Sequence, residues 1–244
     1  MLGGTTEAGL LARALAENGM DAVYSYAGRT LDPVAQPLPL RVGGFGGVAG
    51  LVAYLKEAGV THVIDATHPF AVGMSGNAVL ACAEAGVALL ALERPAWLPG
   101  PGDHWTSVAA GAAAAAALPH VPTRVFLAIG RQTLAEFAGV PQHHYLLRLV
   151  DQPAGPLPLP RVKVVLGRGP FRLEDDLELM RRHGTEVVVT KNSGGDGARA
   201  KLDAARLLGL AVIIIERPAR PDRPAVTTVA EVMAWLGHAA PRGV

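Results

Sequence analysis

The sequence is short of cysteine, of aromatic residues and of net charge. Cys82 is the only cysteine, so no intramolecular disulfide can form, which suits a reducing cytosol. Lys and Arg total 22 against 21 Asp and Glu, a formal net charge of +1. This balance supplies no overall field that would attract nucleic acid or an anionic membrane. An anionic ligand must therefore be met by basic residues placed locally.

Long hydrophobic runs are absent as well. Stretches such as Val212–Ile215 and the alanine-rich 108–118 are far shorter than the roughly 20 residues that span a bilayer. Met1–Gly4 shows no basic segment followed by an apolar run, which a signal peptide would have. We therefore expect a soluble, cytoplasmic protein whose partners include neither nucleic acid nor a membrane.

Several well-known catalytic motifs are missing. The dinucleotide fingerprint G-x-G-x-x-G does not occur. Gly4 and Gly9 have the spacing of a P-loop, but Leu10 and Leu11 stand where Lys and Ser or Thr are required, which disfavours a nucleotide triphosphatase. No Tyr-x-x-x-Lys pair supports a short-chain-type dehydrogenase. The eight histidines lack metal-ligand spacing, so we expect no bound metal.

The chain does contain an internal repeat. The matching segments are Gly86–Ala96 with Gly209–Ala219 (123 residues apart), Thr61–Ile64 with Thr185–Val188 (124 apart), Thr106–Ala109 with Thr227–Ala230 (121 apart), and Gly3 with Gly130 (127 apart). Spacings this similar along the chain indicate a duplication. Two halves of similar topology are predicted.

Within each half, short apolar runs alternate with segments that have helical periodicity. Predicted helices cover 5–18, 48–58, 75–85, 107–118, 132–138, 173–183, 197–208 and 228–238; predicted strands cover 22–26, 62–66, 88–92, 124–129, 145–150, 162–166, 186–190 and 211–216. This alternation is typical of α/β proteins with parallel sheets covered by helices on both faces. We predict two Rossmann-like domains, 1–120 and 121–244, with the active-site cleft between them.

Ligands of open α/β sheets lie at the carboxyl ends of the strands, so the loops there hold the candidate site residues. Gly3, Gly4, Thr5, Thr6 and Glu7 open the first helix, where free N–H groups and the helix dipole favour a phosphate. A tight turn capped by Thr5 or Thr6 explains the same residues without a ligand.

The loop after the second strand bears on the choice of cofactor. NAD enzymes usually place a carboxylate there, on the ribose 2′-hydroxyl. This chain has Ser25, Gly28 and Arg29 with no carboxylate before Asp32, and Arg29 suits a 2′-phosphate. The loop therefore favours NADPH over NADH. The alternative is a solvated loop arginine, which is common.

Thr67, His68 and Pro69 follow the strand that ends at Asp65. They are candidates for positioning the nicotinamide ribose, with His68 as a candidate proton donor. The alternative is a histidine with a purely structural role.

Basic residues follow several strands. They are Arg94, Arg131, Arg168, Lys191 and Arg217. If the two halves face each other, these cations suit a ligand with several carboxylates or phosphates. The alternative is that Arg94 and Arg217 pair with the adjacent Glu93 and Glu216.

The loop Lys191-Asn192-Ser193-Gly194-Gly195 is a candidate anion site, with Lys201 on the helix that follows. Lys191 is the second candidate catalytic residue. A Schiff-base role is chemically open to it, but no other feature supports that role, and anion binding by Lys191, Ser193 and the glycine amides is preferred. Ser193 lacks the surroundings of a serine-hydrolase nucleophile.

Six of these segments, in order along the chain, resemble those of precorrin-6A reductases. They are Gly3–Ala8, Asp65–Ala71, Glu93–Trp97, Ile129–Gln132, Thr190–Gly194 and Ile215–Pro218. The resemblance runs from residue 2 to about residue 236. It departs at the start, where only Met1 and Leu2 precede Gly3 while the family has an apolar first strand.

The resemblance implies reduction of one double bond of the precorrin-6A macrocycle by hydride from NADPH, giving precorrin-6B in cobalamin biosynthesis. It implies two Rossmann-like domains, a pyrophosphate held by residues 3–6, and a nicotinamide beside residues 67–69. The substrate carboxylates would meet Arg131, Lys191, Ser193 and Lys201, and the product could be channelled to a neighbouring pathway enzyme. Two alternatives stay open: the cobalt-containing version of the reaction, and a dinucleotide-binding sensor or interaction module without catalysis.

Overall fold

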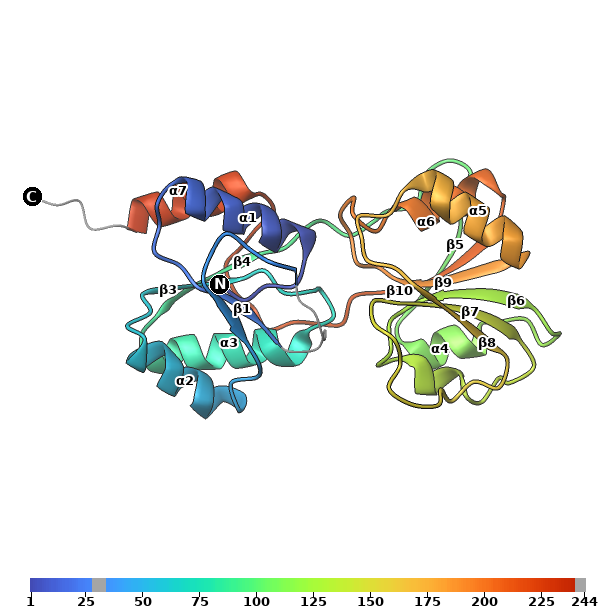
Figure 1. The fold of residues 1–244 in the computed structure, drawn as a ribbon, viewed down its shortest axis with the longest axis horizontal. Coiled ribbons are helices and arrows are strands. Elements are labelled where there is room, and N and C mark those ends of the chain that lie inside the picture. Colours follow the sequence, from blue (N-terminus) through green and yellow to red (C-terminus); the bar gives the residue numbers. More distant parts are fainter. Residues whose placement is uncertain (28–33, 240–244) are drawn as a thin grey trace, which may run out of the picture. The chain divides into compact units, whose positions relative to one another are not determined.

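The computed structural model describes residues 1–27 and 34–239. The chain forms two compact units. The first consists of Met1–Pro95 with Ala219–Val244, and the second of Ala96–Pro218. Each unit is an α/β sandwich whose paired strands are all parallel (Figure 1).

The sheet of the first unit is centred on a single residue. Its strands, in spatial order, are β2 (Leu40–Val42), β1 (Tyr24–Tyr26), Leu2, β3 (His62–Asp65), β4 (Ala88–Leu92) and β11 (Ala225–Val226). Leu2 forms a bridge to both β1 and β3. Towards β3, its N–H donates to Ile64 O (2.8 Å) and its carbonyl accepts from Ala66 N (2.9 Å). Towards β1, the Ser25 N–H donates to Met1 O at 2.9 Å. The flanking residues continue the pairing, with Gly3 N donating to Ser25 O at 3.0 Å.

Helices cover both faces of this sheet. They are α1 (Thr6–Glu17), α2 (Gly47–Glu57), α3 (Val72–Ala85) and α7 (Val229–Ala239). Leu11 and Leu15 of α1 pack with Val232 of α7 over one face, and α2 and α3 form a second core over the other (Figure 1). The alternation of β3 divides its side chains between them, with Ile64 in the first core and Val63 in the second.

The second unit has a six-stranded sheet. Its order is β5 (His104–Val108), β10 (Ala211–Ile215), β9 (Val187–Lys191), β6 (Arg124–Ala128), β7 (His144–Leu149) and β8 (Val162–Leu166). Its helices are α4 (Gly111–Ala116), the 3-10 turn η1 (Leu134–Phe137), α5 (Leu173–His183) and α6 (Ala200–Leu207). Central strands are buried on both faces, as their continuous apolar sequences predict.

The predicted boundary between residues 120 and 121 is wrong. β5 follows β4 in the sequence but pairs with β10 in the second sheet, while β11 follows β10 but pairs with β4 in the first. The last strand and helix of each half thus belong to the other half's unit. The chain passes into the second unit at Ala96 and leaves it after Pro218.

The two sheets share one strand order, if β11 and β5 are treated as equivalent edge strands. That order is what a duplication would produce, and Thr106–Ala109 and Thr227–Ala230 begin within β5 and directly after β11. The duplication itself stays a prediction. In the described residues, no helix has the length and apolar character needed to cross a membrane.

Candidate active site

The carboxyl ends of the first sheet's strands surround a shallow hollow. It is lined by Thr5, Glu7, Thr67, Pro69, Leu92, Glu93 and Arg94. These residues come from the start of α1, the loop after β3 and the end of β4. Four of the residues predicted to bind cofactor, Thr5, Glu7, Thr67 and Pro69, are thereby brought together in one place.

Some of the hydrogen-bonding groups in the predicted phosphate loop are occupied by partners within the protein. The Thr5 hydroxyl caps α1 by accepting from Ala8 N (3.1 Å), and it donates to Ala66 O (3.0 Å). The Gly4 amide donates to the Tyr24 hydroxyl at 2.9 Å. Since the first turn of a helix offers several amides without helical partners, those of Thr6 and Glu7 are the candidates for binding a ligand.

Glycine stands at positions 3 and 4 of this loop for two different reasons. A methyl group on Gly3 would lie 2.1 Å from ring carbon Cζ of Tyr24, so Gly3 makes room for a buried aromatic ring. Gly4 has φ = 121° with open space around it, a conformation that side chains disfavour. Ser25 is buried in β1. Gly28 and Arg29, predicted to select NADPH, lie outside the described residues.

Arg94 forms an ion pair with Glu7 in the hollow. Their side chains are 12% and 18% exposed, so the pair is shielded from solvent. A carboxylate would repel a phosphate beside the helix N-terminus, and Arg94 neutralises it. Arg94 was predicted to bind substrate, with pairing to the adjacent Glu93 as the alternative; the structure gives it Glu7 as a partner within the first unit.

Asp65 holds the start of the Thr67–Phe70 loop through hydrogen bonds. Its Oδ1 accepts from the Thr67 amide (3.2 Å) and from the Thr67 hydroxyl (2.7 Å). The Phe70 amide donates to Nδ1 of His68 at 3.2 Å. Because Nδ1 is then an acceptor, the proton of the neutral imidazole lies on Nε2.

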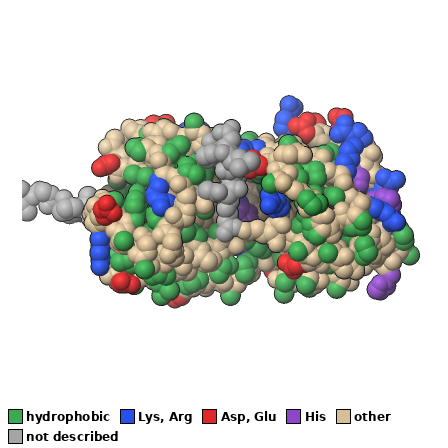
Figure 2. Space-filling view, turned by 60° about the horizontal axis from the view of Figure 1, so that its bottom comes forward, with side chains coloured by type: hydrophobic (Ala, Val, Ile, Leu, Met, Phe, Trp, Pro, Cys, Tyr) green, Lys and Arg blue, Asp and Glu red, His purple; other side chains and the backbone are tan. Residues whose placement is uncertain are grey.

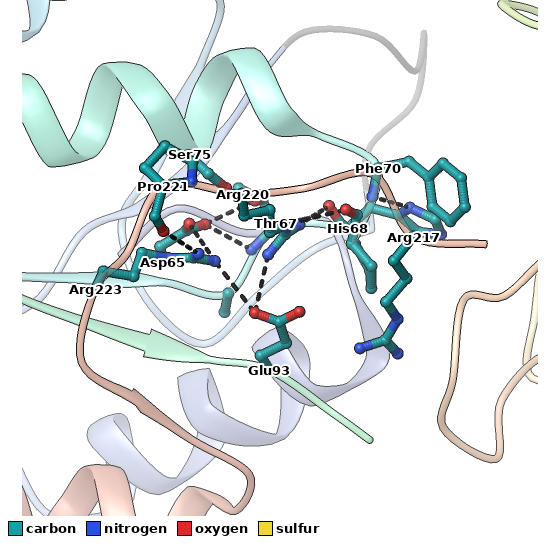
Figure 3. Close-up of polar contacts among 12 residues, drawn as sticks. Asp65, Thr67, His68, Phe70, Ser75, Glu93, Arg217, Arg220, Pro221 and Arg223 are labelled. Atoms are coloured by element: carbon teal, nitrogen blue, oxygen red, sulfur yellow. Dashed lines mark hydrogen bonds and ion pairs between the residues drawn. The ribbon is translucent and has the colours of Figure 1, made fainter. Parts of the chain in front are cut away.

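Two arginines that the sequence reading missed complete this region. Arg220 and Arg223 lie in the segment before β11 and contact Glu93, Asp65 and the 67–70 loop (Figure 3). The sequence contains a pattern that points to them, since arginines recur at every third position, at 217, 220 and 223, between prolines. Only the first of the three was considered.

In the second unit, the loop after β9 begins with buried, hydrogen-bonded side chains. Asn192 is buried: its Oδ1 accepts from Trp97 N (2.8 Å), and its Nδ2 donates to Trp97 O (3.1 Å) and Glu216 Oε2 (3.2 Å). Gly194 and Gly195 have φ of 67° and 69°, so glycine is needed there for backbone conformation. Ser193 is also buried, and its hydroxyl donates to Lys191 O at 3.4 Å.

Lys201 and Arg217 hold this loop in place. The Lys201 side chain is buried, donates to Ala198 O and lies 4.7 Å from the centre of the Trp97 ring. Arg217 donates to Asn192 O (3.0 Å) and Ser193 O (3.2 Å). Direct contact between Lys201 and a substrate is therefore not what the geometry favours. Trp97, not singled out from the sequence, is the residue around which the loop is built.

Three predicted cations remain at the carboxyl edge of the second sheet. Arg131 and Arg168 are exposed after β6 and β8, and Arg168 lies 3.8 Å from Asp151. Lys191, at the end of β9, is partly buried. Burial lowers the pKa of its ammonium, and the Glu136 carboxylate opposes that shift.

A further basic group lies at the opposite, amino-terminal edge of this sheet. Burial lowers the pKa of His183, and the nearby Arg124, Lys163 and His144 lower it further. Figure 2 shows Lys, Arg and His side chains gathered on this unit. Since ligands of such sheets bind at the other edge, this group is not part of the candidate site.

The fold and the first-unit hollow define a doubly wound α/β protein, a class that binds nucleotides at helix N-termini beside the carboxyl ends of its strands. Residues 1–237 match the family described as "Precorrin-6x reductase CbiJ/CobK", and the chain belongs to that family of reductases.

Similar proteins cover nearly the whole chain. It is 62% identical over 246 residues to a precorrin-6A reductase of Rhodobacter capsulatus, covering 100% of this chain and 98% of that protein. A precorrin-6A reductase of Sinorhizobium sp is 46% identical over 239 residues, covering 98% of this chain and 92% of its own. A solved structure named CobK precorrin-6A reductase matches with a TM-score of 0.96 at 62% identity, over 100% of this chain and 98% of that one.

The chain is also similar, at lower identity, to proteins with a different name. A cobalt-precorrin-6A reductase of Priestia megaterium is 32% identical over 193 residues, covering 75% of each chain. Within the described residues, no three His, Cys, Asp or Glu side chains are grouped to hold a metal ion.

Proposed function

We propose that this protein reduces one double bond of the precorrin-6A macrocycle with NADPH, giving precorrin-6B, in cobalamin biosynthesis. Family membership over residues 1–237 carries the proposal. Relatives named precorrin-6A reductase are 41% to 62% identical, whereas those named for the cobalt-containing substrate are 30% to 32% identical. This difference favours the metal-free substrate.

The residues of the first-unit hollow fit the phosphate part of a dinucleotide. The amides of Thr6 and Glu7 are donors at the positive end of the α1 dipole. Gly4 leaves its backbone open to close approach. Arg94 neutralises Glu7, which removes the nearest negative charge from the path of a pyrophosphate. When bound there, NADPH supplies the hydride.

Thr67, His68 and Pro69 are proposed to orient the nicotinamide end. With Nδ1 accepting from Phe70 N, neutral His68 presents an N–H at Nε2. Hydride transfer needs donor and acceptor carbons about 3–3.5 Å apart, so a loop with fixed geometry contributes through orientation. The proton that completes the reduction comes from His68 or from water.

Arg131, Arg168 and Lys191 are proposed to meet the carboxylates of the macrocycle. They follow β6, β8 and β9 at the carboxyl edge of the second sheet, where Arg131 and Arg168 are exposed and Lys191 is partly buried. Asn192, Ser193, Gly194, Lys201 and Arg217 are proposed to keep that edge in shape, through the contacts around Trp97 and the loop carbonyls.

The test is turnover by the purified protein with metal-free precorrin-6A. NADPH oxidation is followed optically, NADH is compared in parallel, and the product mass is measured. Consumption of NADPH with gain of two hydrogens supports the proposal. Turnover only with the cobalt-containing macrocycle would move the assignment to that reaction. NADPH binding without turnover of either macrocycle would favour a dinucleotide-binding sensor.

A further inference from the structure

Arg220 and Arg223 are buried charges that the proposed reaction does not use. Their side chains are 9% and 5% exposed. Burying a guanidinium is costly unless its donors are satisfied by charged or carbonyl partners. Where those donors point therefore indicates what the two residues do.

Arg220 donates hydrogen bonds to the backbone of the 67–70 loop. Its Nη2 donates to His68 O (2.6 Å), its Nε to Pro69 O (2.9 Å) and its Nη1 to Glu93 Oε2 (3.2 Å). The loop has neither helix nor strand structure, so regular secondary structure cannot satisfy these successive carbonyls. The planar fork of arginine places a separate nitrogen on each carbonyl and a third on Glu93, an arrangement that the compact ammonium of lysine does not reproduce.

Arg223 fixes the other side of the same loop. Its Nη2 lies 3.3 Å from Asp65 Oδ2 and 3.3 Å from Glu93 Oε2. The other oxygen of Asp65 holds the amide and the hydroxyl of Thr67. Two guanidinium groups and two carboxylates thus alternate beneath the loop, and Thr67, His68 and Pro69 are each attached to one of them (Figure 3).

We infer that Arg220 is a positioning residue for the cofactor loop, held in its own orientation by Glu93, which Arg223 also contacts. This inference rests on the proposed function, because it assigns the 67–69 loop to the nicotinamide end. Arg220 acts through the backbone of His68 and Pro69. It belongs to the segment that joins the first unit after the chain has left the second, so the loop is complete only when Ala219–Val244 is in place.

The test compares Arg220→Lys with a matched control, Arg206→Lys. Arg206 makes a two-pronged contact with Asp103 in the second unit, at 2.9 and 2.8 Å, so the control loses the same fork without touching the loop. NADPH affinity, KM and kcat are measured on the full-length protein. Hydrogen exchange is followed at the amides of Thr67, Phe70 and Ala71.

We expect Arg220→Lys to weaken NADPH binding about tenfold, since one charge-assisted hydrogen bond is lost. The KM for the macrocycle at saturating NADPH stays within about twofold. Exchange of the three loop amides becomes faster, because His68 O also anchors the Ala71 amide at 2.7 Å. Arg206→Lys leaves NADPH affinity and loop exchange unchanged.

Two results would overturn the inference. One is Arg220→Lys with unaltered NADPH affinity and unaltered loop exchange. The other is an equal effect of both variants, which would mean that general destabilisation is responsible. If the wild-type protein fails to bind NADPH, the proposed function fails instead, and loop exchange in Arg220→Lys still decides whether Arg220 holds the loop.

Discussion

The two units carry the same strand order but differ in how exposed the cations at their carboxyl edges are. In the first unit, the charged side chains are paired: Arg94 with Glu7, and Arg220 and Arg223 with Glu93 and Asp65. In the second, Arg131 and Arg168 are exposed, and Arg168 lies 3.8 Å from Asp151. Paired, buried charges fix a loop, whereas exposed cations are available to an anionic ligand.

The two sheets also differ in the strand at their centre. The second sheet has β6, five residues long, at its centre, and the first has Leu2 at the corresponding place. Gly3 follows Leu2 directly and packs on Tyr24, whose hydroxyl accepts the Gly4 amide. Gly130, at the corresponding place after β6, has φ = 72° and open space around it. One topology thus supports a compact cofactor loop in one unit and an open edge in the other.

The largest expected effect comes from removing the exposed cations together. Arg131→Ala with Arg168→Ala should raise the KM for the macrocycle roughly 100-fold, since each charge-assisted hydrogen bond contributes about 1.5 kcal/mol or more. NADPH affinity should stay unchanged. Steady-state kinetics with each ligand varied in turn makes the measurement. A parallel loss of NADPH affinity would contradict the assignment of NADPH and the macrocycle to different units.

Substitution of the corresponding glycines should sharpen the comparison. Gly3→Ala forces a methyl group into the Tyr24 ring and should cost about 3 kcal/mol of stability and weaken NADPH binding. Gly130→Ala meets no atom within 4 Å, so only its left-handed backbone resists, at about 1 kcal/mol. Denaturant unfolding and NADPH titration report both. Equal loss of NADPH affinity in the two variants would contradict the account.

Lys191 predicts a pH dependence of substrate binding. Its pKa is lowered by burial, so the cation is lost as pH rises through a value below the ordinary lysine range. The KM for the macrocycle should therefore rise earlier in alkaline solution than a normal lysine would allow. Lys191→Arg, which stays charged there, should flatten the profile. Identical profiles for the two proteins would remove Lys191 from the substrate contacts.

The smallest expected effect concerns stability at acid pH. His143 is fully buried, its Nδ1 accepts from Thr123 N (3.2 Å), and burial lowers its pKa. The unfolded chain therefore binds the proton first, so stability is complete above about pH 6.5 and falls as pH drops below it. His143→Gln should reduce that fall, by at most about 1.4 kcal/mol per pH unit. Chemical unfolding at pH 7 and pH 5.5 tests it against the wild type.

Much of the fold could be predicted from the sequence, because its central strands are continuous apolar runs. The helix at 173–183 and the strand at 162–166 have the predicted bounds. The edge strands β2, β5 and β11 were missed, since they are short and largely exposed and so lack a hydrophobic pattern. Missing β5 and β11 also hid the exchange of edge strands and led to the wrong boundary.

The loops of the candidate site could be predicted from the sequence, but the contacts of its residues could not. Strand ends identified the loops at Thr5, Thr67 and Lys191. Sequence alone could not tell that the Lys201 ammonium lies over Trp97, or that Arg94 is paired with Glu7. Such contacts join residues distant in the chain. Arg220 and Arg223 were overlooked for the same reason, although their spacing was visible.

The central claim is that cofactor and macrocycle are bound by different units, and hydrogen exchange with each ligand alone tests it most directly. NADPH should slow exchange in peptides covering residues 4–9 and 66–72, and the macrocycle in peptides covering 129–133, 166–170 and 190–196. Protection of the second-unit loops by NADPH alone, with the first unit unaffected, would contradict the account.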